Sequence, residues 1–217
     1  MRRPMPPRNS AAGAGFSLIE VLVAMLIVVV GLLGLAGMQA RAQIAELESY
    51  QRAQALVLLY DMMDRINNSR TTAPCYAVTT NTTAGTPYFG EGATATAACS
   101  VSNPADQAMA IASMTAWNNL LQGASETKSG GATKVGAMVG ARGCVSYNVN
   151  SEYVNATTGA NVAGTGEYTV AVSWQGMADT FTPTRACAKD LYDPAGGSDT
   201  KRRTVWATMR IGTLATR

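Results

Sequence analysis

A single carboxylate, Glu20, stands at the start of a long apolar segment. The chain has no charged residue from Val21 to Met38, and Phe16, Leu18 and Ile19 extend the apolar character towards the N-terminus. This length approaches the roughly 20 residues that a helix needs to cross a hydrocarbon core about 30 Å thick. A carboxylate inside such a helix costs roughly 2.5–3.5 kcal/mol on insertion scales. We therefore expect Glu20 to pair with a cation, and the simpler alternative is a membrane anchor that tolerates one acid.

The segment that precedes the apolar run, residues 1–15, is basic and rich in proline and small residues. Its arginines, Arg2, Arg3 and Arg8, are typical of the positive-inside signal, which predicts a cytoplasmic leader and export of everything after the helix. Without the leader the chain has 14 basic and 14 acidic residues, so it would be neutral. The charge balance therefore argues against nucleic-acid binding.

The spacing of these features resembles that of a type IV prepilin: a basic leader ending in Gly15, then Phe16, then Glu20 at the fifth position of the mature chain, then an apolar helix. The resemblance implies that prepilin peptidase cleaves between Gly15 and Phe16 and methylates the new amine of Phe16. It also implies that Glu20 pairs with the Phe16 amine of its own or a neighbouring subunit.

Three stretches, 13–40, 56–68 and 99–121, resemble the minor pilins of the PilV type. Major pilins generally carry a helix-breaking proline near position 37, where this chain instead has glycines at positions 31, 34 and 37. The resemblance implies a minor pilin of the type IV pilus, incorporated into the filament or its priming tip complex and needed for assembly, twitching motility or adhesion. Two alternatives are a type II secretion pseudopilin and a membrane-anchored pilin that binds DNA or surfaces.

The same resemblance implies a location and a set of partners. The chain would sit in the bacterial inner membrane with its head in the periplasm, and would later reach the pilus at the cell surface. Its partners would be prepilin peptidase, other major and minor pilins, the inner-membrane pilus assembly platform and a tip adhesin.

The apolar segment, 16–38, is expected to continue as an amphipathic helix over 39–69. If it is unbroken, the helix is on the order of 80 Å long at 1.5 Å per residue. Apolar residues recur at helical spacing in its second half, which leaves one stripe to pack on a head. Glu48 and Arg52 are four residues apart and are expected to pair on the exposed side.

The remainder, 70–217, is expected to form an exported globular head. Asn103 and the proline after it predict a helix over 104–122 with Asn103 as its cap. Trp117 in this helix is read as a buried anchor rather than a binding aromatic. Alternating apolar residues predict strands in the last third of the chain, at 140–149, 167–175 and 204–211. The fold class is therefore α+β, with the long helix packed on a small antiparallel sheet as in the type IV pilin fold.

Four cysteines, all in the head, are the residues from which covalent links can form. An even number in an oxidising compartment predicts two disulfides, for which three connectivities exist. We favour Cys75–Cys99 and Cys144–Cys187, because each pair flanks what reads as one structural unit. The first pair would also close the long, weakly periodic connection 67–102.

Residue types argue against an enzyme. The chain has no histidine, which excludes Ser-His and Cys-His pairs and makes a zinc site improbable, so no catalytic residue, metal or cofactor is expected. Asp190, Asp193 and Asp199 could bind calcium, but without the spacing of an EF-hand they are read as loop-shaping residues. The run Lys201-Arg202-Arg203 could contact DNA, but we expect it to be the solvated start of a strand, offset by those aspartates.

Overall fold

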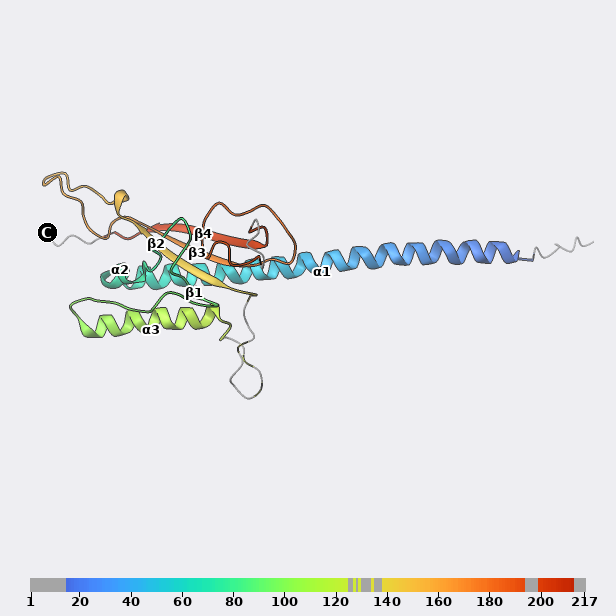
Figure 1. The fold of residues 1–217 in the computed structure, drawn as a ribbon, viewed down its shortest axis with the longest axis horizontal. Helices are drawn as coiled ribbons and strands as arrows, with labels where there is room; N and C mark the ends of the chain where they lie inside the picture. The colour runs from blue at the N-terminus through green and yellow to red at the C-terminus, as the bar shows by residue number, and fades with distance from the viewer. Residues whose placement is uncertain are drawn as a thin grey trace, which may run out of the picture. The chain divides into compact units, whose positions relative to one another are not determined.

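The computed structural model describes residues 15–124, 127, 129, 134, 138–193 and 199–212. The chain divides into two compact units, Met1–Glu46 and Leu47–Arg217. Helix α1, Leu18–Asn68, contributes residues to both units (Figure 1). The second unit, called the head below, also contains all the other helices and strands of the described residues.

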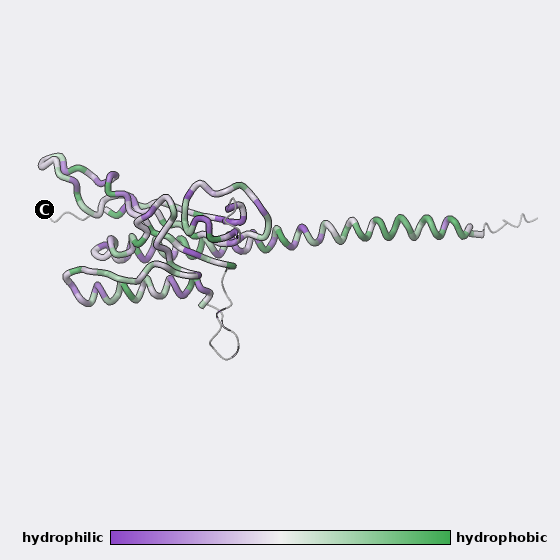
Figure 2. Tube along the Cα trace, viewed as in Figure 1, coloured by the Kyte–Doolittle hydropathy of each residue, from purple (hydrophilic) through white to green (hydrophobic). Residues whose placement is uncertain are grey.

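The first unit consists of the apolar part of α1. The helix begins at Leu18, two residues after Phe16, because the carbonyl of Ser17 accepts hydrogen bonds from the amides of Glu20 and Val21 at 3.0 and 3.3 Å. Figure 2 shows a nearly continuous run of hydrophobic residues along this segment. The helix is long and apolar enough to cross a membrane, and none of its most apolar window of 18 residues is buried.

In the head, two helices bury one stripe each. The residues buried along α1 are Ala55, Leu59, Met62 and Ile66. In α3, Pro104–Leu121, they are Ala110, Met114, Trp117 and Leu121. Both sets follow the i, i+4, i+7, i+11 spacing of one helix face. As predicted, Asn103 caps α3, and its Oδ1 accepts a hydrogen bond from the Ala105 amide at 3.0 Å.

A four-stranded antiparallel sheet completes the head, in the order β1-β2-β3-β4. Its strands are β1 (Phe89–Gly90), β2 (Arg142–Asn148), β3 (Glu167–Gln175) and β4 (Arg202–Arg210). The bounds of β3 are those predicted, whereas β4 begins two residues earlier than 204 and β1 was not predicted. The fold class is α+β, as expected from the sequence.

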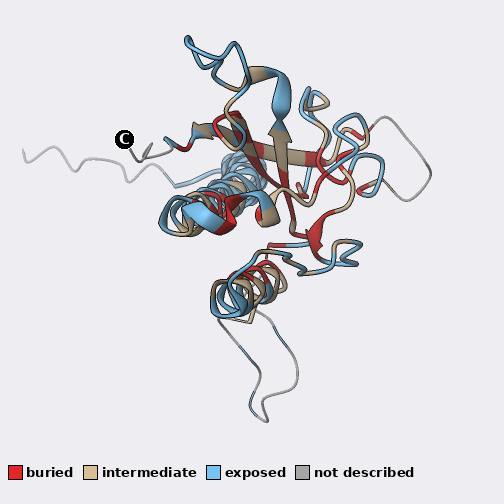
Figure 3. Ribbon diagram, turned by 90° about the vertical axis from the view of Figure 1, so that its left-hand side faces the viewer, coloured by how far each residue is buried: buried red, intermediate tan, exposed pale blue. Residues whose placement is uncertain are grey.

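The core lies on one face of this sheet, against α1 and α3 (Figure 3). As its alternation predicted, β3 buries Tyr168, Val170, Val172 and Trp174 on that face. Trp117 of α3 is fully buried and packs edge-to-face on Phe89, with ring centroids 6.0 Å apart. Gly143 of β2 allows this packing, because a side-chain Cβ at position 143 would overlap the Trp117 ring.

The connection 67–102 is more ordered than its composition suggested. It contains a 3-10 turn, η1 (Arg70–Thr72), a one-turn helix, α2 (Ala73–Tyr76), and strand β1. Tyr76 is fully buried in the core. Local periodicity cannot reveal such short elements, because each is fixed by its contacts with the core rather than by a repeating pattern.

Candidate functional site

Gly15, Phe16 and Glu20 lie at the exposed beginning of α1. Phe16 is 82% exposed, and Gly15 has no neighbouring atom within 4 Å of the position where a Cβ would stand. Phe16 and Glu20 border the same shallow apolar surface on one side of the helix, together with Val21 and Ala24. The Gly15–Phe16 peptide bond is thus sterically accessible to another molecule.

The Glu20 side chain forms no ion pair or hydrogen bond with any of the residues that the structure describes. It stands on a helix whose apolar side chains are exposed over several turns. An apolar surface of this extent needs lipid or other apolar helices to cover it. Once it is covered, the carboxylate needs a cation, because an unpaired charge in such surroundings is strongly destabilising.

Both disulfides of the head join the pairs that the sequence favoured. Cys75 of α2 is bonded to Cys99, and Cys144 of β2 is bonded to Cys187. The first bond ties the end of the long helix region to the segment that leads into α3. The second fastens the segment between β3 and β4 to the sheet, where Cys144 and Cys187 are both buried.

The Cys144–Cys187 bond lies in a second buried cluster, which includes Tyr88 and Tyr192. The guanidinium of Arg142 lies over both rings, at 5.6 Å from the centroid of Tyr88 and 4.9 Å from that of Tyr192. The Tyr192 hydroxyl donates a hydrogen bond to the carbonyl of Gly140 at 3.0 Å. Burial raises the pKa of Tyr192 above its ordinary value, so its hydroxyl keeps the proton that it donates to Gly140.

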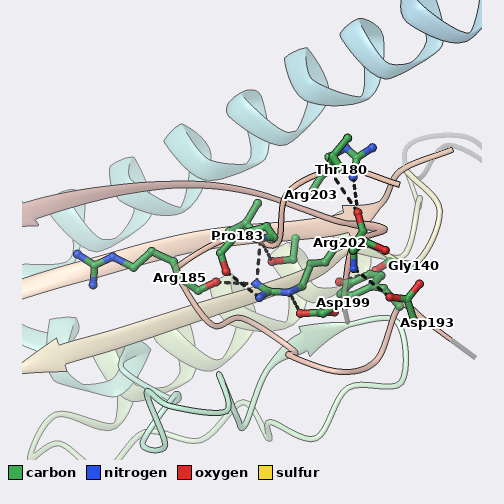
Figure 4. Close-up of polar contacts among 12 residues, drawn as sticks. Gly140, Thr180, Pro183, Arg185, Asp193, Asp199, Arg202 and Arg203 are labelled. Atoms are coloured by element: carbon green, nitrogen blue, oxygen red, sulfur yellow. Dashed lines mark hydrogen bonds and ion pairs between the residues drawn. The ribbon is translucent and has the colours of Figure 1, made fainter. Parts of the chain in front are cut away.

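Arg202 is the largest departure from the sequence-based expectation. It was predicted to be solvated at the start of a strand, but it is 1% exposed. Its guanidinium donates to the Asp199 carboxylate and to the carbonyls of Arg185 at 2.6 Å and Pro183 at 3.2 Å (Figure 4). A buried guanidinium needs these partners because it has five donors and no acceptor. Arg202 therefore holds the segment after β3 against β4.

Arg203 is also engaged, and its partner corrects a second expectation. Its guanidinium pairs with Glu48 at 3.1 Å, and the same carboxylate accepts a hydrogen bond from the Met177 amide at 3.2 Å. The predicted i,i+4 pair of Glu48 with Arg52 is not formed. Glu48 is instead bound to groups of the sheet region, which fixes the register of α1 against β4 within the head.

Two of the three aspartates proposed as calcium ligands have other partners. Asp193 accepts a hydrogen bond from the Thr200 amide at 2.9 Å, and Asp199 pairs with Arg202. Within the described residues, no group of three or more His, Cys, Asp or Glu side chains is placed to hold a metal ion. Two of the three basic residues that could contact DNA are not available for it, because Arg202 is buried and Arg203 is paired with Glu48.

Sequence reasoning missed one exposed feature of the head. The Arg185 guanidinium lies 4.3 Å from the ring centroid of Trp206 on the outward face of β4. Trp206 is 47% exposed, whereas Val205 before it is buried. The available signal was a large aromatic residue on the polar side of the β4 alternation, where small or charged residues are usual.

Comparisons with protein-family models, with curated proteins and with solved structures found no match to the chain. Function is therefore inferred from the geometry of the chain. That geometry combines an exposed apolar helix carrying one acid with a disulfide-bonded head, and the chemistry it offers is association with other molecules.

Proposed function

We propose that this chain is a minor pilin of the type IV pilus, of the PilV type, inserted in the bacterial inner membrane and then built into the filament or its tip complex. The observation that carries the proposal is the arrangement at the start of α1. An accessible Gly15–Phe16 bond is followed by Glu20, which has no partner among the described residues, at the start of the exposed apolar part of α1.

The chemistry of that arrangement supports cleavage as the step that completes the site. Cutting after Gly15 creates an ammonium at Phe16, four residues from Glu20 and bordering the same surface. The new cation would satisfy the carboxylate when helices of neighbouring subunits exclude water. A matched pair of charges at one depth in a bundle of apolar helices also fixes the register of one helix against the next.

The structure of the head is consistent with the same proposal. Its two disulfides are of the kind that form and remain stable in an oxidising compartment outside the cytoplasm. Major and minor pilins, prepilin peptidase, the inner-membrane assembly platform and a tip adhesin are the partners that this proposal entails. The leader would remain cytoplasmic and the head periplasmic until assembly.

The test is incorporation into filaments. Sheared pili and membranes from cells expressing the wild-type chain, Glu20→Ala and Glu20→Asp would be probed with an antibody against the head. We expect the wild type in the pilus fraction, Glu20→Ala processed but retained in the membrane, and Glu20→Asp intermediate because it keeps the charge.

Deletion of the gene separates pilus from secretion roles. Loss of piliation or twitching with normal protein secretion supports the proposal. Loss of secretion with intact pili contradicts it and identifies the pseudopilin alternative. Equal amounts of wild type and Glu20→Ala in sheared pili would contradict the proposed role of the carboxylate.

A further inference from the structure

A small hollow of about 60 Å³ opens on the face of the sheet opposite the core, beside the Cys144–Cys187 disulfide. Arg185, Ser146 and Thr169 are among the residues that line it. We propose that this hollow binds a small oxyanion, the group shared by carboxylates, phosphates and sulfates. The inference does not rest on the proposed function.

Arg185 is exposed but held in place by three contacts. Its guanidinium lies over the Trp206 ring, its carbonyl accepts a hydrogen bond from the buried Arg202 at 2.6 Å, and Cys187, two residues later, is fixed by its disulfide. In Figure 4 its side chain extends away from the Arg202 cluster. A preorganised guanidinium loses less entropy on binding than a free surface arginine.

The charge of Arg185 has no partner within the described part of the chain. Its guanidinium forms no hydrogen bond or ion pair there. None of the described residues that line the hollow is acidic. Arg65, Arg202 and Arg203, in contrast, each pair with a carboxylate. The hollow therefore presents uncompensated positive charge, which suits an anion.

Two hydroxyl groups complete the donor set. Ser146 and Thr169 are directly opposite each other in the β2–β3 register, and neither hydroxyl is hydrogen-bonded to a described residue. Thr79, which also lines the hollow, has its hydroxyl occupied by the Pro87 carbonyl at 2.8 Å. A guanidinium and two hydroxyls are the donors that commonly bind carboxylate, phosphate or sulfate oxygens.

The size of the hollow limits the ligand. About 60 Å³ exceeds the roughly 10–15 Å³ that a single buried water needs. The hollow therefore accommodates a small charged group. The ligand is therefore a free anion or the charged end of a larger molecule.

Binding can be measured on the full chain in a neutral detergent, by calorimetric titration with acetate, methyl phosphate and methyl sulfate at constant ionic strength. We expect saturable binding of at least one probe, weakened about tenfold or more in Arg185→Gln, since hydrogen bonds to charged groups contribute about 1.5–3 kcal/mol. The tightest probe then distinguishes a carboxylate source from a phosphate or sulfate source.

Two further variants make the test specific to the hollow. Arg210→Gln is the matched control, because Arg210 also lies over an aromatic ring, that of Tyr153, at 5.3 Å, but does not line the hollow. It should bind the probe as the wild type does. The double variant Ser146→Ala/Thr169→Val should bind more weakly with Arg185 intact.

The proposal is overturned by any of three results. These are no saturable binding of all three probes, equal binding by Arg185→Gln, and wild-type binding by the double hydroxyl variant. Thermal unfolding of each variant checks that the fold is retained. Arg185→Gln and the double hydroxyl variant alter only exposed or half-buried side chains, so we expect both to stay folded. A variant that loses binding because it unfolds is recognised by its lower unfolding temperature.

Discussion

The indole Nε1 of Trp117 donates a hydrogen bond of 2.9 Å to the carbonyl oxygen of Leu58, which lies 59 residues earlier in the chain. This bond joins α3 to the part of α1 that belongs to the head. It forms between a fully buried side chain and a backbone carbonyl, so it fixes both the depth and the rotation of α3 against α1.

Replacing Trp117 tests this relationship. Trp117→Phe retains an aromatic ring but loses the donor, and should lower the free energy of unfolding by about 1 kcal/mol beyond the effect of lost volume. Trp117→Ala should cost roughly 3–5 kcal/mol because it also leaves a cavity. Chemical denaturation of the full chain in detergent, followed by the exposure of the remaining tryptophans, measures both. A Trp117→Phe variant that loses no more stability than its lost volume explains would contradict a separate role for the hydrogen bond.

Replacing only one partner of the buried ion pair between Arg202 and Asp199 is predicted to lower the free energy of unfolding strongly. Arg202→Met should destabilise the head by roughly 3–5 kcal/mol, because it leaves the Asp199 carboxylate buried without a cation. Asp199→Asn/Arg202→Met should recover part of that loss, since neither partner is then charged. Urea denaturation of both variants gives the comparison. A double variant no more stable than Arg202→Met would refute this explanation.

The buried side chain of Tyr168 leads us to expect that the head loses stability at alkaline pH. Burial is the main cause that raises the pKa of Tyr168 to about 12, from an ordinary value of 10.0. The folded state therefore holds this proton more tightly than the unfolded state does. The resulting stabilisation is complete below pH 10 and is lost as the pH rises towards 12.

Tyr168→Phe should reduce this alkaline loss. At neutral pH the substitution should leave the free energy of unfolding unchanged or raise it slightly, because the Tyr168 hydroxyl is buried without a partner among the described residues. Thermal unfolding midpoints measured from pH 7 to about pH 12 test both statements. Parallel profiles for the variant and the wild type would show that another group governs the alkaline transition.

The two disulfides are predicted to stabilise the head by similar amounts. They link residues separated by 24 and 43 positions, for which the chain-entropy model gives about 3.5 and about 4 kcal/mol. Cys75→Ser/Cys99→Ser and Cys144→Ser/Cys187→Ser should each lower the free energy of unfolding accordingly. Denaturation with and without reductant provides the measurement. A wild-type head that keeps its stability after both bonds are reduced would contradict the prediction.

Parts of the fold with a repeating pattern were predictable from the sequence. The alternation in 167–175 gave the bounds of β3 and its buried face, and the Asn103 cap gave the start of α3. The cysteine pairs could be assigned because each encloses one structural unit. For β3 and α3 the signal lies within one element, so short-range physics is sufficient.

The features that were missed depend on distant partners. Arg202 looks solvated beside two other cations, and its burial depends on the distant carbonyls of Pro183 and Arg185 as well as on Asp199. Glu48 pairs with Arg203, 155 residues away, rather than with Arg52 on its own helix. Strand β1 has two residues, too few for any alternation. None of these could be read from local sequence.

We propose that the mature chain begins at Phe16, so that a new ammonium joins Glu20 at the start of an exposed apolar helix. Intact mass and N-terminal analysis of the membrane-extracted protein, from cells with and without prepilin peptidase, tests this proposal directly. We expect a chain that starts at methylated Phe16 only where the peptidase is present. A chain that still carries Arg2 and Arg3 in both strains would contradict it and reduce the protein to an anchored, exported domain.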